Sequence, residues 1–224
     1  MVTHERWAPS YRVVASRFPH VSIYDRISDA AQLATVLEIE ALTNPRVREE
    51  AGAYRKVRPE DRIAGAGSTP IMASFAYSGP SRFCDGTYGV YYAAHEEATA
   101  IAESRYHTEL FLRATQQPSI DVDKRIYGAT IEGDFDDIRG RSLRSKLYAA
   151  APDDYAFSQR YAHRLYMKNL VDGIVYTSVR EPEGQCLAAF RPRNVSNARI
   201  RKYIQFRWDG RRIAGVVDLT NIRD

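Results

Sequence analysis

The chain has 224 residues, a length typical of one domain or of one domain with a small extension. Its residues are 44% hydrophobic and 27% charged, which predicts a folded core and excludes wholesale disorder. No apolar run approaches the length of a membrane helix, and no apolar secretion signal follows Met1. Two cysteines, Cys84 and Cys186, are too few for a disulfide scaffold, so we expect a reducing, cytoplasmic location without membrane association.

The net charge of +4 is unevenly distributed along the chain. A basic strip near the C-terminus contains Arg199, Arg201, Lys202, Arg207, Arg211 and Arg212. Against these six cations stands only Asp209, so the strip alone carries +5 and the rest of the chain is nearly neutral. Such a stretch can bind nucleic acid or an acidic partner, or it can be a solvated hairpin whose charges protect a sheet edge.

The first elements expected along the chain are a helix, a long loop and a strand. Ser28-Asp29 can cap a helix that Asn44-Pro45 stops. Residues 51–70 are rich in glycine, proline and charge, which is typical of a long loop that covers or lines a site. The turn signal Asp85-Gly86 precedes Tyr88–Ala94, which predicts a strand.

A long helix is predicted next, from about Glu96 to Thr115. Glu103 and His107 are four residues apart and therefore share one face of it. The small apolar neighbours of Glu103 indicate partial burial, and a buried carboxylate needs a partner. An ordinary surface pair between Glu103 and His107 or an arginine is the alternative.

The second half of the chain predicts mainly strands. Ile120–Ile131 is a candidate strand, and Pro152 opens a helix that runs through Leu170. Gly173–Val179 and Gln185–Phe190 are rich in β-forming residues and are joined by turn residues, which predicts a hairpin.

The C-terminal stretch alternates apolar and polar residues up to the turn Asp209-Gly210, and Ile213–Val217 follows, so we expect a second hairpin. Strands and helices do not alternate regularly, which favours a single compact α+β domain with a mostly antiparallel sheet core and flanking helices. We take this domain as residues 1–224, with a core over about 11–192 and a basic β-hairpin extension over 193–224.

Several familiar active-site patterns are missing. Thr99 stands where the zinc motif that begins at His95-Glu96 would need its second histidine, so we expect no metal. Gly65 and Gly67 lack the third glycine and the preceding strand of a dinucleotide fingerprint. The sequence also has no Walker loop and no Gly-x-Ser-x-Gly elbow.

The densest chemistry lies between Ser81 and His107, and its motifs resemble the RES domain, the toxin half of RES–Xre toxin–antitoxin pairs. The matching segments are Ser-Tyr-Arg12-Val-Val, Arg82-Phe-Cys-Asp-Gly, Val-Tyr-Tyr92-Ala-Ala, Ala-Thr-Ala-Ile-Ala-Glu103, Gly-Ile-Val-Tyr-Thr-Ser178-Val-Arg and Leu-Ala-Ala-Phe190. They keep their order over about residues 11–192. Ser-Arg17-Phe-Pro-His, Leu-Thr-Asn-Pro-Arg46 and the C-terminal tail resemble the longer ParT-like toxins.

The resemblance implies a fold similar to ADP-ribosyltransferases and NAD+ as the substrate. Family members break the nicotinamide–ribose bond and pass ADP-ribose to water, phosphate or a protein side chain. We therefore expect the toxin of a type II toxin–antitoxin system, with ADP-ribosylation of a host protein preferred to NAD+ glycohydrolase or phosphorylase activity. The expected partner is an Xre-like antitoxin that blocks the site, and no direct contact with nucleic acid is expected.

The resemblance also assigns roles to residues. Glu103 would stabilise the positive charge that develops on the ribose, and nicotinamide leaves as a neutral molecule without a general acid. Guanidinium groups suit a pyrophosphate, which makes Arg12, Arg82 and Arg17 the candidate binders.

The remaining candidates would complete the site. Tyr92 offers a flat face and a hydroxyl to nicotinamide or ribose. Ser178 can donate a hydrogen bond to the ribose or the carboxamide. The expected catalytic set is Glu103, Tyr92, Arg82 and Ser178, with His107 as a further candidate.

Two non-enzymatic functions stay open at this point. A nucleic-acid binder would use the basic strip together with Tyr203, Phe206 and Trp208. A pure interaction module would use the same strip as a docking surface, which is compatible with an enzyme that docks an antitoxin there.

Overall fold

The computed structural model describes the chain except for residues 17–28, 30, 33–34, 37–56, 78 and 220–224. Arg17 lies outside the described residues, as does most of the helix expected after Ser28-Asp29. At the start of that helix Asp29 Oδ1 accepts a hydrogen bond from Ala31 N at 2.8 Å, which is the contact of an N-cap.

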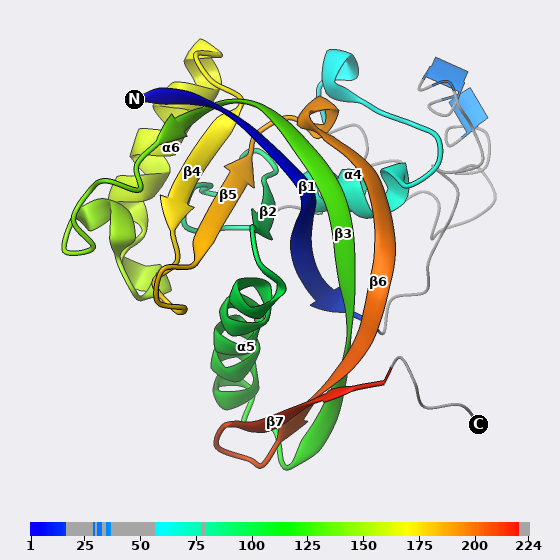
Figure 1. Ribbon diagram of the computed structural model, residues 1–224, viewed down its shortest axis with the longest axis vertical. Coiled ribbons are helices and arrows are strands. Elements are labelled where there is room, and N and C mark those ends of the chain that lie inside the picture. The colour runs from blue at the N-terminus through cyan, green and yellow to red at the C-terminus, as the bar shows by residue number, and fades with distance from the viewer. Residues whose placement is uncertain (17–28, 30, 33–34, 37–56, 78, 220–224) are drawn as a thin grey trace.

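A mixed seven-stranded sheet organises the molecule (Figure 1). Its strands are β1 (Val2–Ala15), β2 (Tyr91–Ala94), β3 (Ile120–Asp137), β4 (Gly173–Thr177), β5 (Gln185–Ala189), β6 (Val195–Trp208) and β7 (Ile213–Asp218). They follow the order β1-β2-β5-β4-β3-β6-β7. Because β1 also pairs with β3, the strands β1, β2, β5, β4 and β3 form a closed ring of paired strands. Among the strands of the described residues, only the β3–β4 pair is parallel. The single α+β domain with a mostly antiparallel sheet is therefore confirmed.

The long strand β3 is the centre of this sheet. One of its edges pairs with β1 from Val2 to Ala15, and the other pairs first with β6 and then with β4. This third partner explains why the strand predicted over Ile120–Ile131 continues to Asp137. The sequence did not predict β1, because Pro9 and several charged residues interrupt the alternation of apolar and polar residues. Long-range pairing with β3 stabilises this strand although its local β-propensity is weak.

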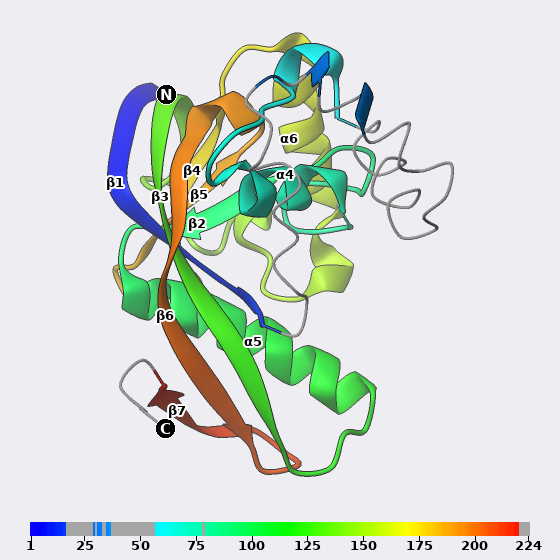
Figure 2. The ribbon, with the colours of Figure 1, turned by 90° about the vertical axis from the view of Figure 1, so that its right-hand side faces the viewer.

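Figure 2 shows the helices α4, α5 and α6. Of these, α5 matches its prediction closely and α6 matches in part. Helix α5 (Glu97–Ala114) differs from its prediction by one residue at each end. Pro152 opens a short 3-10 turn, and α6 (Ala156–Lys168) follows it. Asn169 then ends α6 in the left-handed region, with φ 49°, just before Leu170. Of the loop predicted over 51–70, residues 51–56 lie outside the described residues, and the part from 57 to 67 contains the short 3-10 turn Pro59–Asp61. Its last three residues already belong to helix α4 (Ser68–Ala76), which the sequence did not predict.

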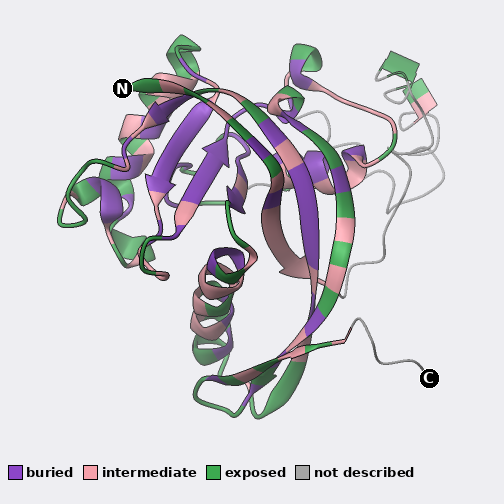
Figure 3. Ribbon diagram, in the orientation of Figure 1, coloured by how far each residue is buried: buried purple, intermediate pink, exposed green. Residues whose placement is uncertain are grey.

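The C-terminal hairpin is built into the sheet. Strand β6 pairs with β3 over most of its length, and its residues Phe206 and Trp208 are buried in one apolar cluster with Leu112 of α5. Figure 3 shows both buried and exposed positions in the sheet. The arginines of the basic strip lie on exposed positions. The hairpin is thus apolar on one face and charged on the other. No helix in the described part of the chain is long and apolar enough to cross a membrane.

Candidate active site

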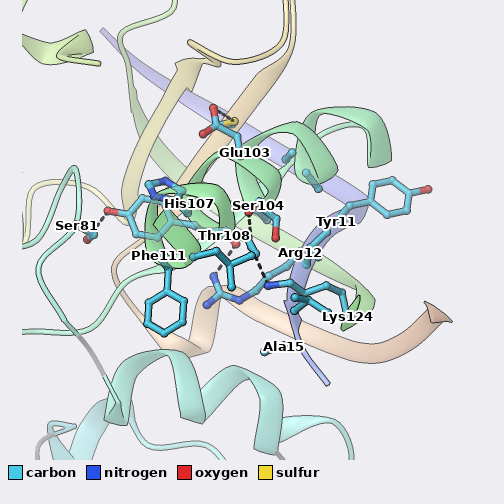
Figure 4. Close-up of a pocket in the computed structure, with 18 of the residues that line it drawn as sticks. Tyr11, Arg12, Ala15, Ser81, Glu103, Ser104, His107, Thr108, Phe111 and Lys124 are labelled. Atoms are coloured by element: carbon cyan, nitrogen blue, oxygen red, sulfur yellow. Dashed lines mark hydrogen bonds between the residues drawn. The ribbon is translucent and has the colours of Figure 1, made fainter. Parts of the chain in front are cut away.

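A cleft of about 980 Å³ lies beside α5, at the place where β1, β2 and the turn before β2 meet that helix (Figure 4). Its size falls in the range of small-molecule sites. Five side chains selected from the sequence line this cleft, namely Arg12, Arg82, Tyr92, Glu103 and His107. Residues far apart in the chain therefore converge, as a site requires.

Glu103 and Ser178 form the most closely defined contact of the site. Ser178 follows β4, is 3% exposed and donates a hydrogen bond through Oγ to Glu103 Oε1 at 2.6 Å. Ser178 Oγ itself accepts hydrogen bonds from the backbone N–H of Arg180 at 3.0 Å and of Glu181 at 3.1 Å. Because a serine hydroxyl has one proton, Ser178 orients the carboxylate here and cannot donate to a ribose at the same time.

Cys186 on β5 borders the same carboxylate, a placement that sequence reasoning missed. Its Sγ lies 4.0 Å from Glu103 Oε1, and the side chain lines the cleft although the residue is only 2% exposed. Burial raises the pKa of the Cys186 thiol, and Glu103 raises it further. The thiol is thus held neutral and gives the carboxylate an uncharged neighbour.

Tyr92 uses its hydroxyl to hold the turn that carries Arg82. The hydroxyl contacts Ser81 Oγ at 2.9 Å and accepts a hydrogen bond from Phe83 N at 3.0 Å. Burial raises the pKa of Tyr92, which keeps the phenol protonated. Because the hydroxyl is engaged in the turn, the part of Tyr92 left for a ligand is its ring.

Arg82 is buried, with 7% exposure, and its orientation comes from main-chain oxygens. Nη1 donates to Ala149 O at 2.7 Å, and the guanidinium carbon lies 4.9 Å from the centre of the Tyr155 ring. Carbonyl oxygens are neutral, so these contacts orient the guanidinium without cancelling its charge. The cleft wall at this point is therefore positive.

Arg12 reaches the cleft from β1 and carries a second positive charge. Nη1 donates to Tyr92 O at 2.8 Å, while Nε is buried and has no hydrogen-bond acceptor among the described residues. Burial lowers the pKa of Arg12, but an arginine remains protonated at neutral pH. A buried N–H without an acceptor fits a ligand that brings an anionic oxygen.

His107 lies one helical turn after Glu103, on the same side of α5, as the sequence predicts. Partial loss of hydration in the cleft lowers the pKa of His107, Arg180 and Arg82 lower it further, and Glu103 opposes them. The neutral imidazole is therefore favoured at neutral pH. Arg180 ends one of the segments that resemble the RES domain, but the sequence does not predict it as a site residue, because nothing local distinguishes it from a surface arginine.

No three His, Cys, Asp or Glu side chains within the described residues are grouped so that they could hold a metal ion. Around Glu103 the cleft combines one oriented carboxylate, a neutral histidine and two arginines, and its lining on β3 adds Asp121, Asp123 and Lys124. That donor set suits an anionic organic ligand whose reacting carbon becomes positively charged.

Comparison with known proteins gives a family for the chain. A family model described as the RES domain matches residues 59–209. An uncharacterized protein, y4oC, from Sinorhizobium fredii (strain NBRC 101917 / NGR234) is 27% identical over 206 residues, which cover 91% of this chain and 84% of that protein. The matched range includes Arg82, Tyr92, Glu103 and Ser178, whereas Arg12 precedes it. The chain belongs to the RES-domain family.

Proposed function

We propose that this RES-domain protein is an NAD+-consuming enzyme that cleaves the nicotinamide–ribose bond and transfers ADP-ribose to an acceptor. The observation that supports it best is the Glu103 carboxylate, held by Ser178 Oγ at 2.6 Å, in a cleft that two arginines also line. NAD+ has the matching parts: a pyrophosphate for the guanidinium groups and a ribose carbon that becomes positive during cleavage.

In the proposed reaction the bond between ribose C1′ and the nicotinamide nitrogen breaks, and its electron pair stays with nicotinamide. Glu103 stabilises the positive charge that develops on the ribose, and Ser178 keeps the carboxylate in place. An acceptor oxygen or nitrogen then bonds to C1′ and loses its proton. Arg12 and Arg82 bind the pyrophosphate, and the Tyr92 ring packs against the nicotinamide end.

The acceptor follows from the ParT-like resemblance and is a side chain of a host protein. Water or phosphate in its place would make the protein an NAD+ glycohydrolase or phosphorylase. We further propose that the protein acts in the cytoplasm as the toxin of a type II toxin–antitoxin system, with an Xre-like antitoxin that blocks the cleft.

The nucleic-acid alternative loses most of its support. It relied on three aromatic side chains for base stacking, but Phe206 and Trp208 are 0% and 2% exposed, and Tyr203 alone is available at 44%. We therefore retain the strip as a docking surface compatible with the enzyme.

Release of free nicotinamide from NAD+ tests the proposal. We expect release by the unaltered chain and a loss of about 100- to 1,000-fold in Glu103→Gln, in which the charge is removed and the shape is kept. Glu96→Gln is the matched control, because Glu96 is an exposed carboxylate just ahead of α5 and does not line the cleft. An inactive wild-type chain, or equal loss in both variants, would overturn the assignment.

The acceptor is identified in the same preparation. Mass spectrometry of lysate proteins after incubation with NAD+ should find an ADP-ribose adduct that is absent with Glu103→Gln. Release that proceeds without any adduct and depends on inorganic phosphate would instead indicate a phosphorylase.

A further inference from the structure

Three side chains from separate elements converge on one short segment that borders the cleft. The segment, residues 149–155, includes Pro152 and Tyr155, which line the cleft. Ala149 O accepts from Arg82 Nη1 at 2.7 Å. The next carbonyl, Ala150 O, accepts from the Tyr106 hydroxyl of α5 at 3.0 Å and from Arg180 Nη2.

Arg180 is the centre of this arrangement. Its guanidinium lies over the Tyr106 ring, 3.3 Å from the ring centre, and so joins α5 to the segment through both a cation–π contact and a hydrogen bond. Its backbone N–H donates to Ser178 Oγ, the atom that orients Glu103. One residue therefore contacts the cleft wall, α5 and the serine.

The charge of Arg180 is also felt inside the cleft. It lowers the pKa of His107 and opposes the rise that burial causes in the pKa of Tyr155. Its Nε is buried and has no acceptor among the described residues, so the surrounding contacts constrain the group on several sides without fully satisfying it.

We propose that Arg180 is a positioning residue that fastens residues 149–155 against α5 and so fixes the two cleft-lining groups, Arg82 and Tyr155, that depend on this segment. Arg82 takes its direction from Ala149 O, and Tyr155 lies beneath its guanidinium. If residues 149–155 move away from α5, the acceptor for Arg82 and the aromatic surface beneath it move together. This inference rests on the proposed function only in the test that measures nicotinamide release.

The first test measures hydrogen exchange and needs no activity. In Arg180→Gln we expect faster exchange of the backbone amides of residues 149–155, by about tenfold, which corresponds to one lost hydrogen bond and cation–π contact. Arg113→Gln is the matched control: Arg113 is an exposed arginine on α5 that bonds to Arg211 O at 3.0 Å and to Glu109, and it does not line the cleft. Unchanged exchange in Arg180→Gln would overturn the proposal even if the chain never releases nicotinamide.

The second test is a double-mutant cycle on nicotinamide release with Arg180→Gln and Tyr106→Leu. Each change should raise KM for NAD+ about tenfold with a smaller fall in kcat. The rise in the double variant should stay well below about 100-fold, the product of the two, because both changes remove the cation–π contact, although each also removes its own hydrogen bond to Ala150 O. Arg180→Lys should recover part of the loss, since an ammonium keeps the charge over the ring but lacks the planar fork of the guanidinium. If the two effects multiply in full, Arg180 acts independently of Tyr106 and does not fasten residues 149–155 against α5.

A wild-type chain without nicotinamide release but with the expected exchange pattern would reject the proposed reaction and keep the positioning role. Thermal unfolding of each variant separates both results from a general loss of fold, which would accelerate exchange throughout the chain rather than at residues 149–155.

Discussion

The cleft beside α5 and the basic strip of the C-terminal hairpin both contain arginines, but they hold them differently. In the cleft, Arg82 is 7% exposed and is oriented by carbonyl oxygens. On the strip, the Arg212 side chain is 72% exposed and its contact with Asp209 is 3.8 Å long. Water and salt screen exposed charges, whereas buried charges act strongly on their neighbours. The number of charges in a sequence is therefore a poor guide to the site, and their placement is a good one.

The largest effect within this comparison should come from the contact that orients the carboxylate. Ser178→Ala removes the hydrogen bond to Glu103 and leaves two backbone N–H groups without their acceptor. We expect nicotinamide release to fall about 30-fold, mainly in kcat, as for the loss of a charge-assisted hydrogen bond. Ser196→Ala, at an exposed position of β6, is the control. A change in KM alone would show that Ser178 binds substrate instead.

Arg12→Gln should produce the next largest effect, because it removes the partly buried cation that β1 contributes to the cleft. Glutamine keeps a polar side chain at this position, so the fold should persist, while KM for NAD+ should rise about tenfold through loss of phosphate binding. Steady-state kinetics measure this split. A fall in kcat with unchanged KM would contradict the assignment of Arg12 to the phosphates.

Protonation of two histidines should change the stability of the protein by a smaller amount, in opposite directions for the two residues. The ordinary pKa of 6.5 is lowered for His107 by partial burial and raised for His4 by its hydrogen bond to Asp134. The contribution of His107 to stability is therefore complete above pH 6.5, and it is lost as the pH falls through the pKa of His107 in the folded protein. The contribution of His4 is complete below pH 6.5, and it is lost as the pH rises through the pKa of His4 in the folded protein. An NMR titration should show the two imidazoles on opposite sides of 6.5, and a His107 pKa above that value would contradict the cleft electrostatics.

The smallest effect is expected on the strip. Reversal of Arg199, Arg201 and Arg207 to glutamate should change nicotinamide release by less than about twofold, because exposed charges outside a site contribute little. The same variant tests the docking hypothesis, since an acidic partner should lose affinity in a salt-dependent way. A large fall in activity would mean that the distinction between the two regions is wrong.

Elements with strong local patterns were predicted from the sequence. Helix α5 and the β4–β5 and β6–β7 hairpins have regular apolar spacing and turn residues, and the structure confirms them. Helix α4 follows a glycine-rich stretch, has no side-chain N-cap and contains Pro70 in its first turn, so local signals concealed it. Strand β1 is fixed by long-range pairing with β3, which a single sequence does not display.

The residues proposed for the site lie close together in the structure, but their mutual contacts were not predicted. The motifs identified Glu103, Tyr92 and Ser178, but not that Ser178 bonds to Glu103 or that the Tyr92 hydroxyl serves the turn at Ser81. Cys186 and Arg180 were missed because their importance arises from folding, which brings β5 and the loop after β4 beside α5. Such partnerships depend on tertiary placement and leave no periodic trace in the chain.

The pairing of β1 with β3 means that the folding unit is longer than the stretch that family comparison matches. The RES match starts at residue 59, yet Arg12 stands on β1, ahead of that point. A polypeptide cut at residue 59 would bare a long edge of β3, and exposed strand edges promote aggregation. Trimming this protein to residues 59–209 should therefore yield insoluble material that also lacks one guanidinium of the cleft.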